Sequence, residues 1–292
     1  MEIKASMVKE LRDKTGAGMM DAKKALVETN GDMEKAMEFL RQKGIASADK
    51  KMGRIAAEGT IASVIDGKKG AMIEMNCETD FVAKNDDFKD LASMMAKAVL
   101  ELNPATPEAM LEMDCPVCKK PIGDVIKEKI AKIGEKITIR RFVRYDAGCC
   151  VNTYIHNGKI GVLLEAKCAN GCDETLTKDL CLHIASNAPE YISRAEIPAS
   201  VIEEEKRIEM GKEDLAKKPE NIREKIVQGR IDKLMAQRCL LDQAFVKDPN
   251  QTIAQLIQGK LEVVKFDRFV LGEGLEKRQD NFAEEVMSQI KG

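Results

Sequence analysis

The feature that most constrains the fold of this chain is an internal repeat. The segment from Asp66 to Cys77 aligns with the segment from Asn157 to Cys168, and matched positions keep one constant offset (158 − 67 = 91). A repeat of this kind indicates that one structural unit is built twice. We therefore expect two subdomains of the same plan rather than a single continuous core.

Each copy of the repeat opens with the pattern of a β-hairpin. Asp66-Gly67 and Asn157-Gly158 lie between apolar, alternating runs. These dipeptides favour tight hairpin turns, because both central positions of such a turn need a positive φ. A helix-like segment containing Lys-Asp-Leu follows each hairpin, and a third apolar run closes each copy at 137–143 and 263–270. The pattern predicts an α+β fold whose duplicated core has antiparallel sheets.

The chain before the repeat has helical character. Within residues 1–45, apolar residues recur at helical spacing, and Gly16-Ala17-Gly18 and Asn30-Gly31 break the pattern. This predicts a three-helix bundle that can barely build a core of its own. Residues 46–58 are rich in Ala and Lys, and we expect them to form a linker.

The repeat and its surroundings predict the remaining boundaries. The first core subdomain is expected over residues 59–146 and the second over residues 147–275. The second copy is longer because two charged helical segments, each preceded by a proline, lie within about 198–240. Narrow apolar stripes let such helices pair, so we expect an inserted helical hairpin of coiled-coil character. Over residues 276–292 we expect a C-terminal helical module.

Composition excludes several classes of function. The chain of 292 residues has 47 Lys and Arg against 49 Asp and Glu, no Trp, and 4% aromatic residues. It therefore lacks the excess of cations and the stacking platforms that nucleic-acid binding uses. No apolar run approaches the roughly 20 residues of a membrane helix. The first residues show neither a signal core nor transit-peptide character, and we expect a cytoplasmic protein without membrane contact.

The cysteines allow two interpretations. Nine cysteines, an odd number in a chain of this size, fit reduced thiols better than a disulfide framework. Cys115-Pro116-Val117-Cys118 has the spacing of a zinc knuckle, which Cys149-Cys150 or Cys168/Cys172 could complete. A lone Cys-x-x-Cys is a weak signal, so we favour unpaired loop thiols and predict neither a metal nor a cofactor.

The sequence gives little support for catalysis or for nucleotide binding by the chain itself. A phosphate-binding loop is missing, and the only histidines are His156 and His183. No Ser/His/Asp order and no metalloprotease motif accompanies them. We expect His156 to be exposed beside a turn and His183 to be a packed or surface histidine. The chain is not predicted to be an enzyme.

Two places instead have the character of contact surfaces. Thr79-Asp80-Phe81-Val82 lies in the connector after the first hairpin, where Phe81 stands among polar residues. Surface loops often carry function, and a rigid aromatic at a loop tip suits a partner's pocket. Met19 and Met20 are about 100° apart on a helix, so both cannot point inward. Methionine is well suited to partner surfaces.

Four segments together resemble one family. They are the segments Leu11–Leu26, Thr79–Asn85, Lys132–Ile137 and His156–Val162. In this order they resemble elongation factor Ts, the family of guanine-nucleotide exchange factors for elongation factor Tu, and the length and hairpin resemble its long bacterial form. The resemblance implies a translation elongation factor in protein biosynthesis. It also implies that the chain performs no bond chemistry and needs no cofactor.

The resemblance further implies roles for particular residues. The N-terminal bundle would be similar to a ubiquitin-associated domain and would contact the GTPase domain of elongation factor Tu through Met19 and Met20. The loop equivalent to Thr79–Val82 would displace Mg²⁺ from the partner's nucleotide site, with Asp80 and Phe81 as its working pair. Other partner contacts would be Gly134, Ile137 and His156. The partner would bind in GDP-bound and nucleotide-free forms.

Two other classes of function stay open at this stage. One is a thiol- or zinc-dependent enzyme built around Cys115 and Cys118, which would need a clustered thiolate with a basic neighbour. The other is a scaffold that dimerises through its helical hairpin, as a homodimer or as a dimer of heterodimers. The exposed Phe81 connector distinguishes the exchange-factor hypothesis from both.

Overall fold

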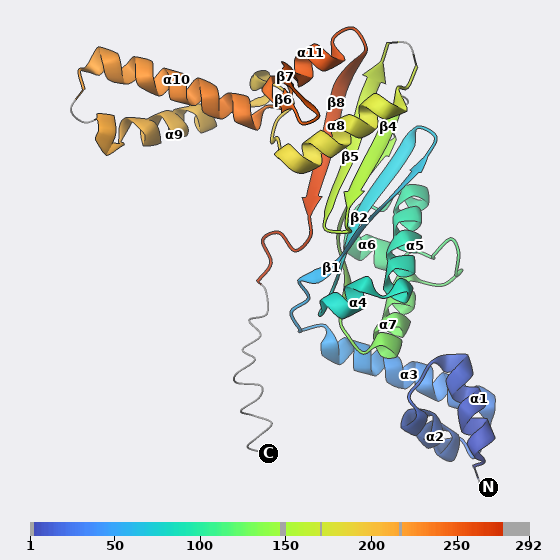
Figure 1. Cartoon of the computed structure of the whole chain (residues 1–292). Helices are drawn as coiled ribbons and strands as arrows, with labels where there is room; N and C mark the ends of the chain where they lie inside the picture. Colours follow the sequence, from blue (N-terminus) through green and yellow to red (C-terminus); the bar gives the residue numbers. More distant parts are fainter. Residues whose placement is uncertain (1–2, 147–149, 170, 216–217, 277–292) are drawn as a thin grey trace.

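A computed structural model describes residues 3–146, 150–169, 171–215 and 218–276 of the chain. Helices and antiparallel sheets both contribute, which confirms the predicted α+β class. Figure 1 shows a helical bundle at the N-terminal end, two sheets in the middle and a pair of helices extending from the second sheet. The C-terminal helical module predicted at 276–292 lies, after its first residue, outside the described part of the chain.

Three helices form the N-terminal bundle: α1 (Ala5–Thr15), α2 (Met19–Glu28) and α3 (Met33–Lys51). Gly16 ends α1 in the left-handed conformation, and the Asp32 side chain caps α3 by accepting from the Lys35 amide. The core of the bundle is small. It consists of Val8, Leu11, Ala22, Ala25, Leu26 and Ala36.

The prediction of a linker at residues 46–58 is wrong over its first part, because α3 continues to Lys51. Ala46 and Ala48 are good helix formers, and tertiary contacts support the extension. Ala48 is buried in the core of the first half, and the Lys127 ammonium lies 3.1 Å from the Asp49 carboxylate. The bundle is therefore attached to the core through a continuous helix that packs along α7.

The first half of the core is a three-stranded antiparallel sheet in the order β1-β2-β3. Its strands are β1 (Glu58–Asp66), β2 (Lys69–Cys77) and β3 (Ile137–Asp146), and its helices are α4 (Asp80–Lys84), α5 (Asp86–Leu102), α6 (Pro107–Leu111) and α7 (Ile122–Ile133). Helices α5 and α7 bury their apolar faces against the sheet, around Phe88, Met95 and Ile130. This cluster is the largest core of the molecule.

The second half repeats the plan with the order β4-β5-β8. Its strands are β4 (Cys150–His156), β5 (Ile160–Cys168) and β8 (Leu261–Val270). The helices α8 (Glu174–Asn187) and α11 (Ile253–Ile257) pack on these strands. A small antiparallel pair, β6 (Ala244–Phe245) and β7 (Asp248–Thr252), lies beside α11. His183 is buried here. Its Nε2 lies 2.9 Å from the Gln243 side-chain oxygen, and desolvation lowers its pKa.

The duplication extends to an irregularity of the sheets. The register between β2 and β3 shifts at Glu74/Met75, and the register between β5 and β8 shifts at Glu165/Ala166. These positions match at the offset of the repeat. Because β-bulges are built features rather than defects, their retention shows that the two halves share one scaffold.

The two hairpin turns differ, although both were expected to place Asp-Gly or Asn-Gly at the central positions. Asn157 and Gly158 both have positive φ, as predicted, and the Lys159 amide donates to the His156 carbonyl. In the first copy the strand runs through Asp66, and Gly67-Lys68 forms the loop with a positive φ at Gly67. A glycine at the first central position fits a type II′ turn, so the first prediction was wrong by one residue.

The two sheets pack against each other through a separate apolar cluster of Ile61, Met72, Tyr145, Val151, Leu163 and Phe269. Gly70 and Gly161 permit this approach from both sides. A Cβ atom on Gly70 would lie 3.0 Å from Leu163, and one on Gly161 would lie 2.6 Å from the Met72 sulfur. Because Met72 and Leu163 are matched positions of the repeat, the two sheets meet in a nearly symmetric way.

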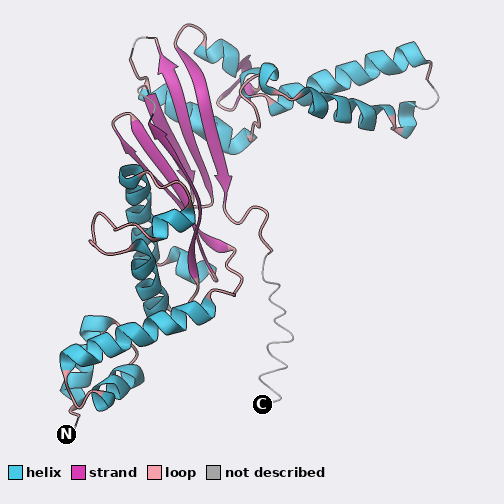
Figure 2. Cartoon of the chain, turned by 180° about the vertical axis from the view of Figure 1, so that it is seen from behind, coloured by secondary structure: helices cyan, strands magenta, loops and turns pink. Residues whose placement is uncertain are grey.

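The insertion in the second half forms the predicted helical hairpin from α9 (Ala199–Met210) and α10 (Glu220–Arg238). The short 3-10 turns η1 (Arg194–Glu196), η2 (Glu213–Leu215) and η3 (Leu240–Asp242) accompany it. Figure 2 shows both helices extending away from the sheets. The apolar side of α10 is Val227, Ile231 and Met235, whereas Ile222 near the start of the helix is exposed.

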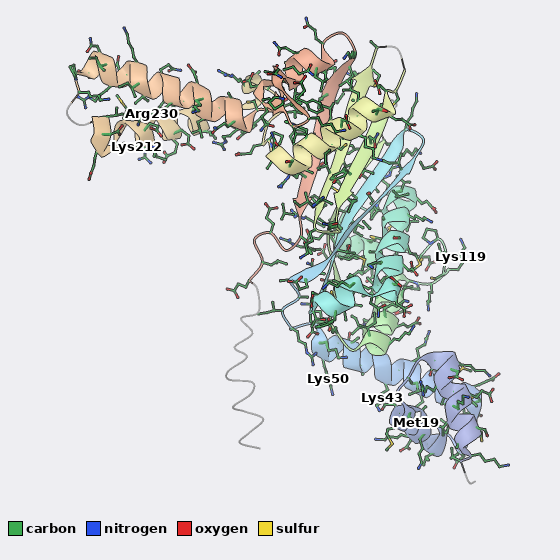
Figure 3. All side chains as sticks on the ribbon, in the orientation of Figure 1. Met19, Lys43, Lys50, Lys119, Lys212 and Arg230 are labelled. Carbon is green, nitrogen blue, oxygen red and sulfur yellow. A yellow bond between two sulfur atoms is a disulfide. The ribbon has the colours of Figure 1, made fainter. Side chains whose placement is uncertain are left out.

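Ion pairs support the outer part of the hairpin. Arg230 of α10 pairs with Glu209 of α9 and with Asp214, and Glu209 also pairs with Lys212. Figure 3 labels Lys212 and Arg230 at this end. Such exposed pairs stabilise weakly, so the apolar stripe holds the two helices together. Among the described residues, no helix is both long and apolar enough to span a membrane.

Candidate functional site

The connector after β2, expected to be a loop, forms the one-turn helix α4. Thr79 is its N-cap, and the Thr79 hydroxyl accepts from the Val82 amide at 3.3 Å. A Thr cap satisfies an amide at the start of the helix, which explains why so short a segment becomes helical. Asn85 then ends α4 and caps α5 through the Asp87 amide. Phe81 is therefore held on a helical turn between two capping residues.

A carboxylate from another part of the chain clamps the start of α4. The Glu135 carboxylate accepts from the Glu78 amide at 3.1 Å, from the Thr79 amide at 3.0 Å and from the Thr79 hydroxyl at 2.6 Å. In return, the Glu78 carboxylate accepts from the Lys136 amide at 2.6 Å. Hydrogen bonds to charged groups are stronger than neutral ones, so these bonds fix the orientation of α4.

The side chains of α4 divide into an inner and an outer set. Val82 and Ala83 pack against the core of the first half. Phe81 is 82% exposed, the most exposed of the large apolar side chains in the described chain. Leaving an aromatic ring in water forgoes the 1.5–3 kcal/mol or so that burial of such a side chain can contribute. An aromatic ring placed so on an anchored turn is suited to insert into a partner.

Asp80 lies beside Phe81 and faces cations. Its carboxylate is 2.6 Å from the Lys84 ammonium, one turn further along α4. This hydrogen bond is the main reason that the pKa of Asp80 is lowered, and the charge of Lys159 adds to the effect. Asp80 is thus ionised at neutral pH. Lys159 belongs to the turn of the second hairpin.

A backbone contact brings that second turn to the first sheet. The Gly158 carbonyl accepts from the Ile61 amide of β1 at 2.8 Å, and a Cβ atom on Gly158 would meet the Thr60 hydroxyl. His156, at the start of this turn, is exposed as expected, and its Nδ1 lies 3.0 Å from the Tyr154 hydroxyl. The structure therefore gathers α4 and the His156–Lys159 turn on neighbouring parts of the surface.

The predicted contacts at Gly134 and Ile137 behave differently from each other. Gly134 ends α7 at a φ of 91° and is exposed, and it leads directly into Glu135. Ile137 is 0% exposed and belongs to the core of the first half. The first position of β3 points into the core opposite Cys77, so the Ile137 side chain is not on the surface, and the partner contact at this position stays a prediction.

Met19 and Met20 open α2, with Gly18 as the N-cap. Both are exposed, Met19 by 55% and Met20 by 77%. The expectation that at least one of them lies on the surface is met by both. They belong to the N-terminal bundle, where Figure 3 labels Met19, and thus form an exposed apolar surface separate from α4.

Sequence reasoning missed Glu135 and Glu78 as functional residues. Neither lies on a periodic apolar pattern, and their partners are 56 to 58 positions away in the chain. The available signal was Glu135 itself, a carboxylate that directly follows a helix-ending glycine within the segment Lys132–Ile137. Only the fold shows that this carboxylate reaches the start of α4.

Comparison with known proteins agrees with these features. The family described as Elongation factor TS matches residues 78–273, which begin at the α4 connector and end after β8. Elongation factor Ts of Alkalilimnicola ehrlichii is 49% identical over 296 aligned residues, which cover 100% of this chain and 100% of that protein. The chain belongs to the elongation factor Ts family. It is accordingly a translation elongation factor with a role in nucleotide exchange, and it does not catalyse bond chemistry.

The cysteines of this elongation factor Ts family member depart from the expectation of reduced thiols throughout. Cys150 and Cys172 form a disulfide, because the ends of β4 and β5 lie side by side and the following loop returns to them. Cys115 is buried and Cys118 exposed. Desolvation, together with Cys115, raises the pKa of Cys118, which is the opposite of what a reactive thiolate needs. The thiol-enzyme hypothesis at this pair loses its support.

Proposed function

We propose that this protein binds elongation factor Tu in its GDP-bound form and speeds GDP release by inserting Phe81 of α4 beside the partner's nucleotide site, where Mg²⁺ is displaced. The observation that carries this proposal is an aromatic ring, 82% exposed, on a turn that Glu135 clamps to the scaffold. Pre-organisation of this kind reduces the entropy lost on binding, so more of the contact energy is available for the partner's rearrangement.

The proposed step needs no catalytic group of this chain. A bound nucleoside diphosphate is held by its charge against Mg²⁺, a lysine and backbone amides. Asp80 and Phe81 would compete with the groups that hold the metal and the phosphate loop, and loss of the metal weakens GDP binding. Because linkage is reciprocal, GDP and the exchange factor weaken each other's binding by the same factor. Rebinding of GTP or GDP then releases the factor.

The other exposed positions supply affinity rather than displacement. Met19 and Met20 form an apolar surface on the bundle, and methionine adapts well to a partner. The turn His156–Lys159 adjoins α4 and extends the contact area from the second half. Gly134 acts through Glu135, which it positions. Nucleotide-free elongation factor Tu would be the state bound most tightly.

The test is the rate of GDP release in a stopped-flow experiment with fluorescent GDP on elongation factor Tu. Truncation of a central, exposed aromatic anchor costs about 2 kcal/mol or more at protein interfaces. Phe81→Ala should therefore slow release at a fixed, subsaturating concentration by about 30-fold or more. The fold of the variant should be unaffected, because Phe81 makes no contribution to the core.

Val117→Ala provides the matched control, since Val117 is an exposed apolar side chain in the same half of the molecule. It should leave the release rate unchanged within about twofold. If Phe81→Ala releases GDP as fast as the wild type while its circular dichroism is unaltered, the role assigned to α4 is wrong. If both variants slow release equally, the effect does not belong to the α4 site.

A further inference from the structure

Three cysteine sulfur atoms meet at one end of the second sheet. They belong to Cys150 at the start of β4, Cys168 at the end of β5, and Cys172 in the connector before α8. All three sulfurs lie within 4.8 Å of one another, and no other group of this kind occurs in the part of the chain that the structure describes. We propose that the reduced form of this cluster binds one thiophilic cation, Zn²⁺ in first place.

The surrounding backbone holds the three cysteines in position. Cys150 and Cys168 are on adjacent antiparallel strands, where Cys150 pairs with Ala166. The connector is bonded at both ends, because the Ala169 amide donates to the Lys260 carbonyl and Asp173 caps α8 through the Leu176 amide. Cys172 stands between these two anchors. The cluster is thus built by the sheet and the connector, not by chance proximity of long side chains.

The geometry suits a thiolate-bound metal. Zinc–sulfur bonds of about 2.3 Å in a tetrahedral arrangement place sulfur atoms roughly 3.8 Å apart, within the limit observed. Three protein ligands leave a fourth position for water or another donor. A cavity of about 570 Å³ adjoins the cluster and is lined by Glu174 among others, so a fourth ligand has access.

The cluster differs from the other cysteines of the chain. Burial raises the pKa of Cys77 to about 12 and that of Cys181 even further, so neither thiol readily becomes the thiolate that metals require. In contrast, Cys168 is half-buried and Cys172 exposed. The expectation of no metal rested on a Cys115–Cys118 knuckle with distant partners. The structure instead assembles a different set of three.

Metal binding competes with the disulfide between Cys150 and Cys172, since the disulfide removes two of the three ligands. Two electrons and two protons from a dithiol reductant open this bond, and the reductant leaves as its own disulfide. Each thiol that then binds exchanges its proton for a sulfur–metal bond. Six described cysteines are free, among them the exposed Cys118, as is typical of proteins in reducing compartments.

Titration of the full-length, reduced protein with Co²⁺ tests the proposal. We expect one equivalent of Co²⁺ per chain, with the thiolate-to-cobalt charge-transfer absorption and the intense visible bands of a tetrahedral site, all removed by Zn²⁺. Cys168→Ser should weaken Co²⁺ binding at least about 100-fold, beyond the 10–100-fold of outer-sphere changes. Cys118→Ser, which alters an exposed thiol outside the cluster, should bind as the wild type does.

Cys172→Ser repeats the test at an exposed ligand whose replacement leaves the core intact, and circular dichroism checks the fold of every variant. The proposal is overturned if the reduced wild type gives no charge-transfer band, or if Cys168→Ser and Cys172→Ser still bind with unchanged affinity. It is likewise overturned if mass spectrometry after alkylation shows that the disulfide persists under conditions that reduce glutathione disulfide.

Discussion

The connectors that follow β2 and β5 start from the same scaffold and end differently. Both leave a strand that carries a bulge after a buried glutamate, and both begin at matched cysteines, Cys77 and Cys168. In the first half the connector becomes α4 and presents Phe81. In the second half the matched position is Cys172, within the sulfur cluster. The comparison shows that the fold supplies two equivalent platforms, and that short connectors decide what each platform does.

The clamp on α4 explains part of the difference. Ile137 pairs with Cys77 and Leu261 pairs with Cys168, so Glu135, two residues before Ile137, matches Gly259. A glycine has no side chain that could accept hydrogen bonds from a connector. In the second half the Ala169 amide donates instead to a backbone carbonyl, that of Lys260. The Glu135 carboxylate is thus one reason why the first connector is a clamped helical turn and the second is a loop.

The largest contrast between the halves is expected at the matched glutamates. Glu74 is fully buried and lies 2.8 Å from Arg140 and 2.7 Å from Arg141, whereas Glu165 lies 3.5 Å from the half-exposed Lys265. Glu74→Gln should lower the free energy of unfolding by about 3 kcal/mol, because a fully buried carboxylate loses its charge and the half-buried Arg140 and Arg141 lose their shared anionic partner. Glu165→Gln should cost about 1 kcal/mol. Urea unfolding of both variants measures the contrast, and equal losses would contradict it.

The stabilising contribution of Glu74 should depend on pH. Burial alone would raise the pKa of Glu74, but hydrogen bonds from the Gly272 amide and both arginines outweigh it and lower the pKa. A carboxyl group with a lowered pKa stabilises the folded state above its unfolded pKa of about 4.3, and this contribution is lost as pH falls through the folded pKa. The stability difference between wild type and Glu74→Gln should be constant from pH 8 to pH 5 or so and shrink below about pH 4.

A smaller effect is expected from releasing α4. Glu135→Ala removes three hydrogen bonds from the Glu78–Thr79 segment while Phe81 stays in place. We expect GDP release from elongation factor Tu to slow about tenfold, equivalent to about 1.4 kcal/mol, with little change in stability. Glu112→Ala, at an exposed carboxylate of the same half, is the control. Unchanged exchange with Glu135→Ala would mean that α4 is rigid without its clamp.

The smallest effect should appear where the halves are most alike. Gly70→Ala and Gly161→Ala each add a methyl group between the sheets, where the new Cβ atom would lie 2.6 Å from Val151 Cγ1 in the first case and 2.6 Å from Ile61 Cγ2 in the second. Each should lower the free energy of unfolding by about 1 kcal/mol, at the low end of the 1–3 kcal/mol typical of overpacking. Similar losses in urea unfolding would support a symmetric contact. A loss confined to one variant would show that only one sheet sets the spacing.

Local patterns in the sequence predicted the scaffold well. The repeat, the turn dipeptides and the helical spacing of apolar residues predicted the hairpin, the long helix and the closing strand of each half. Errors arose where tertiary contacts override local signals. Residues 46–58 were assigned to a linker from their composition, but α3 continues to Lys51, where burial of Ala48 against the first half supports the helix.

The candidate site was predictable only in its exposed part. Phe81 was identifiable because an aromatic residue among polar neighbours in a connector is poorly placed to pack in the core, and its side chain is indeed exposed. The residues that position it lie far away in the sequence, and the buried Ile137 shows that a place in a resembling segment carries no information on burial. The sequence placed Cys150 and Cys168 in two alternative sets of ligands for a zinc knuckle. Only the pairing of β4 with β5 shows that these two cysteines lie close together.

The position of the end of β8 determines where the ends of the core could be joined in a circular permutant. A Cβ atom on Gly272 would lie 2.6 Å from the Ala57 carbonyl oxygen, and the Gly272 amide donates to buried Glu74. The chain therefore enters and leaves the duplicated core at almost one place. A short peptide could join these two points, and new termini could be opened in the exposed Gly67-Lys68 loop. The duplicated core is in this sense a ready-made candidate for circular permutation.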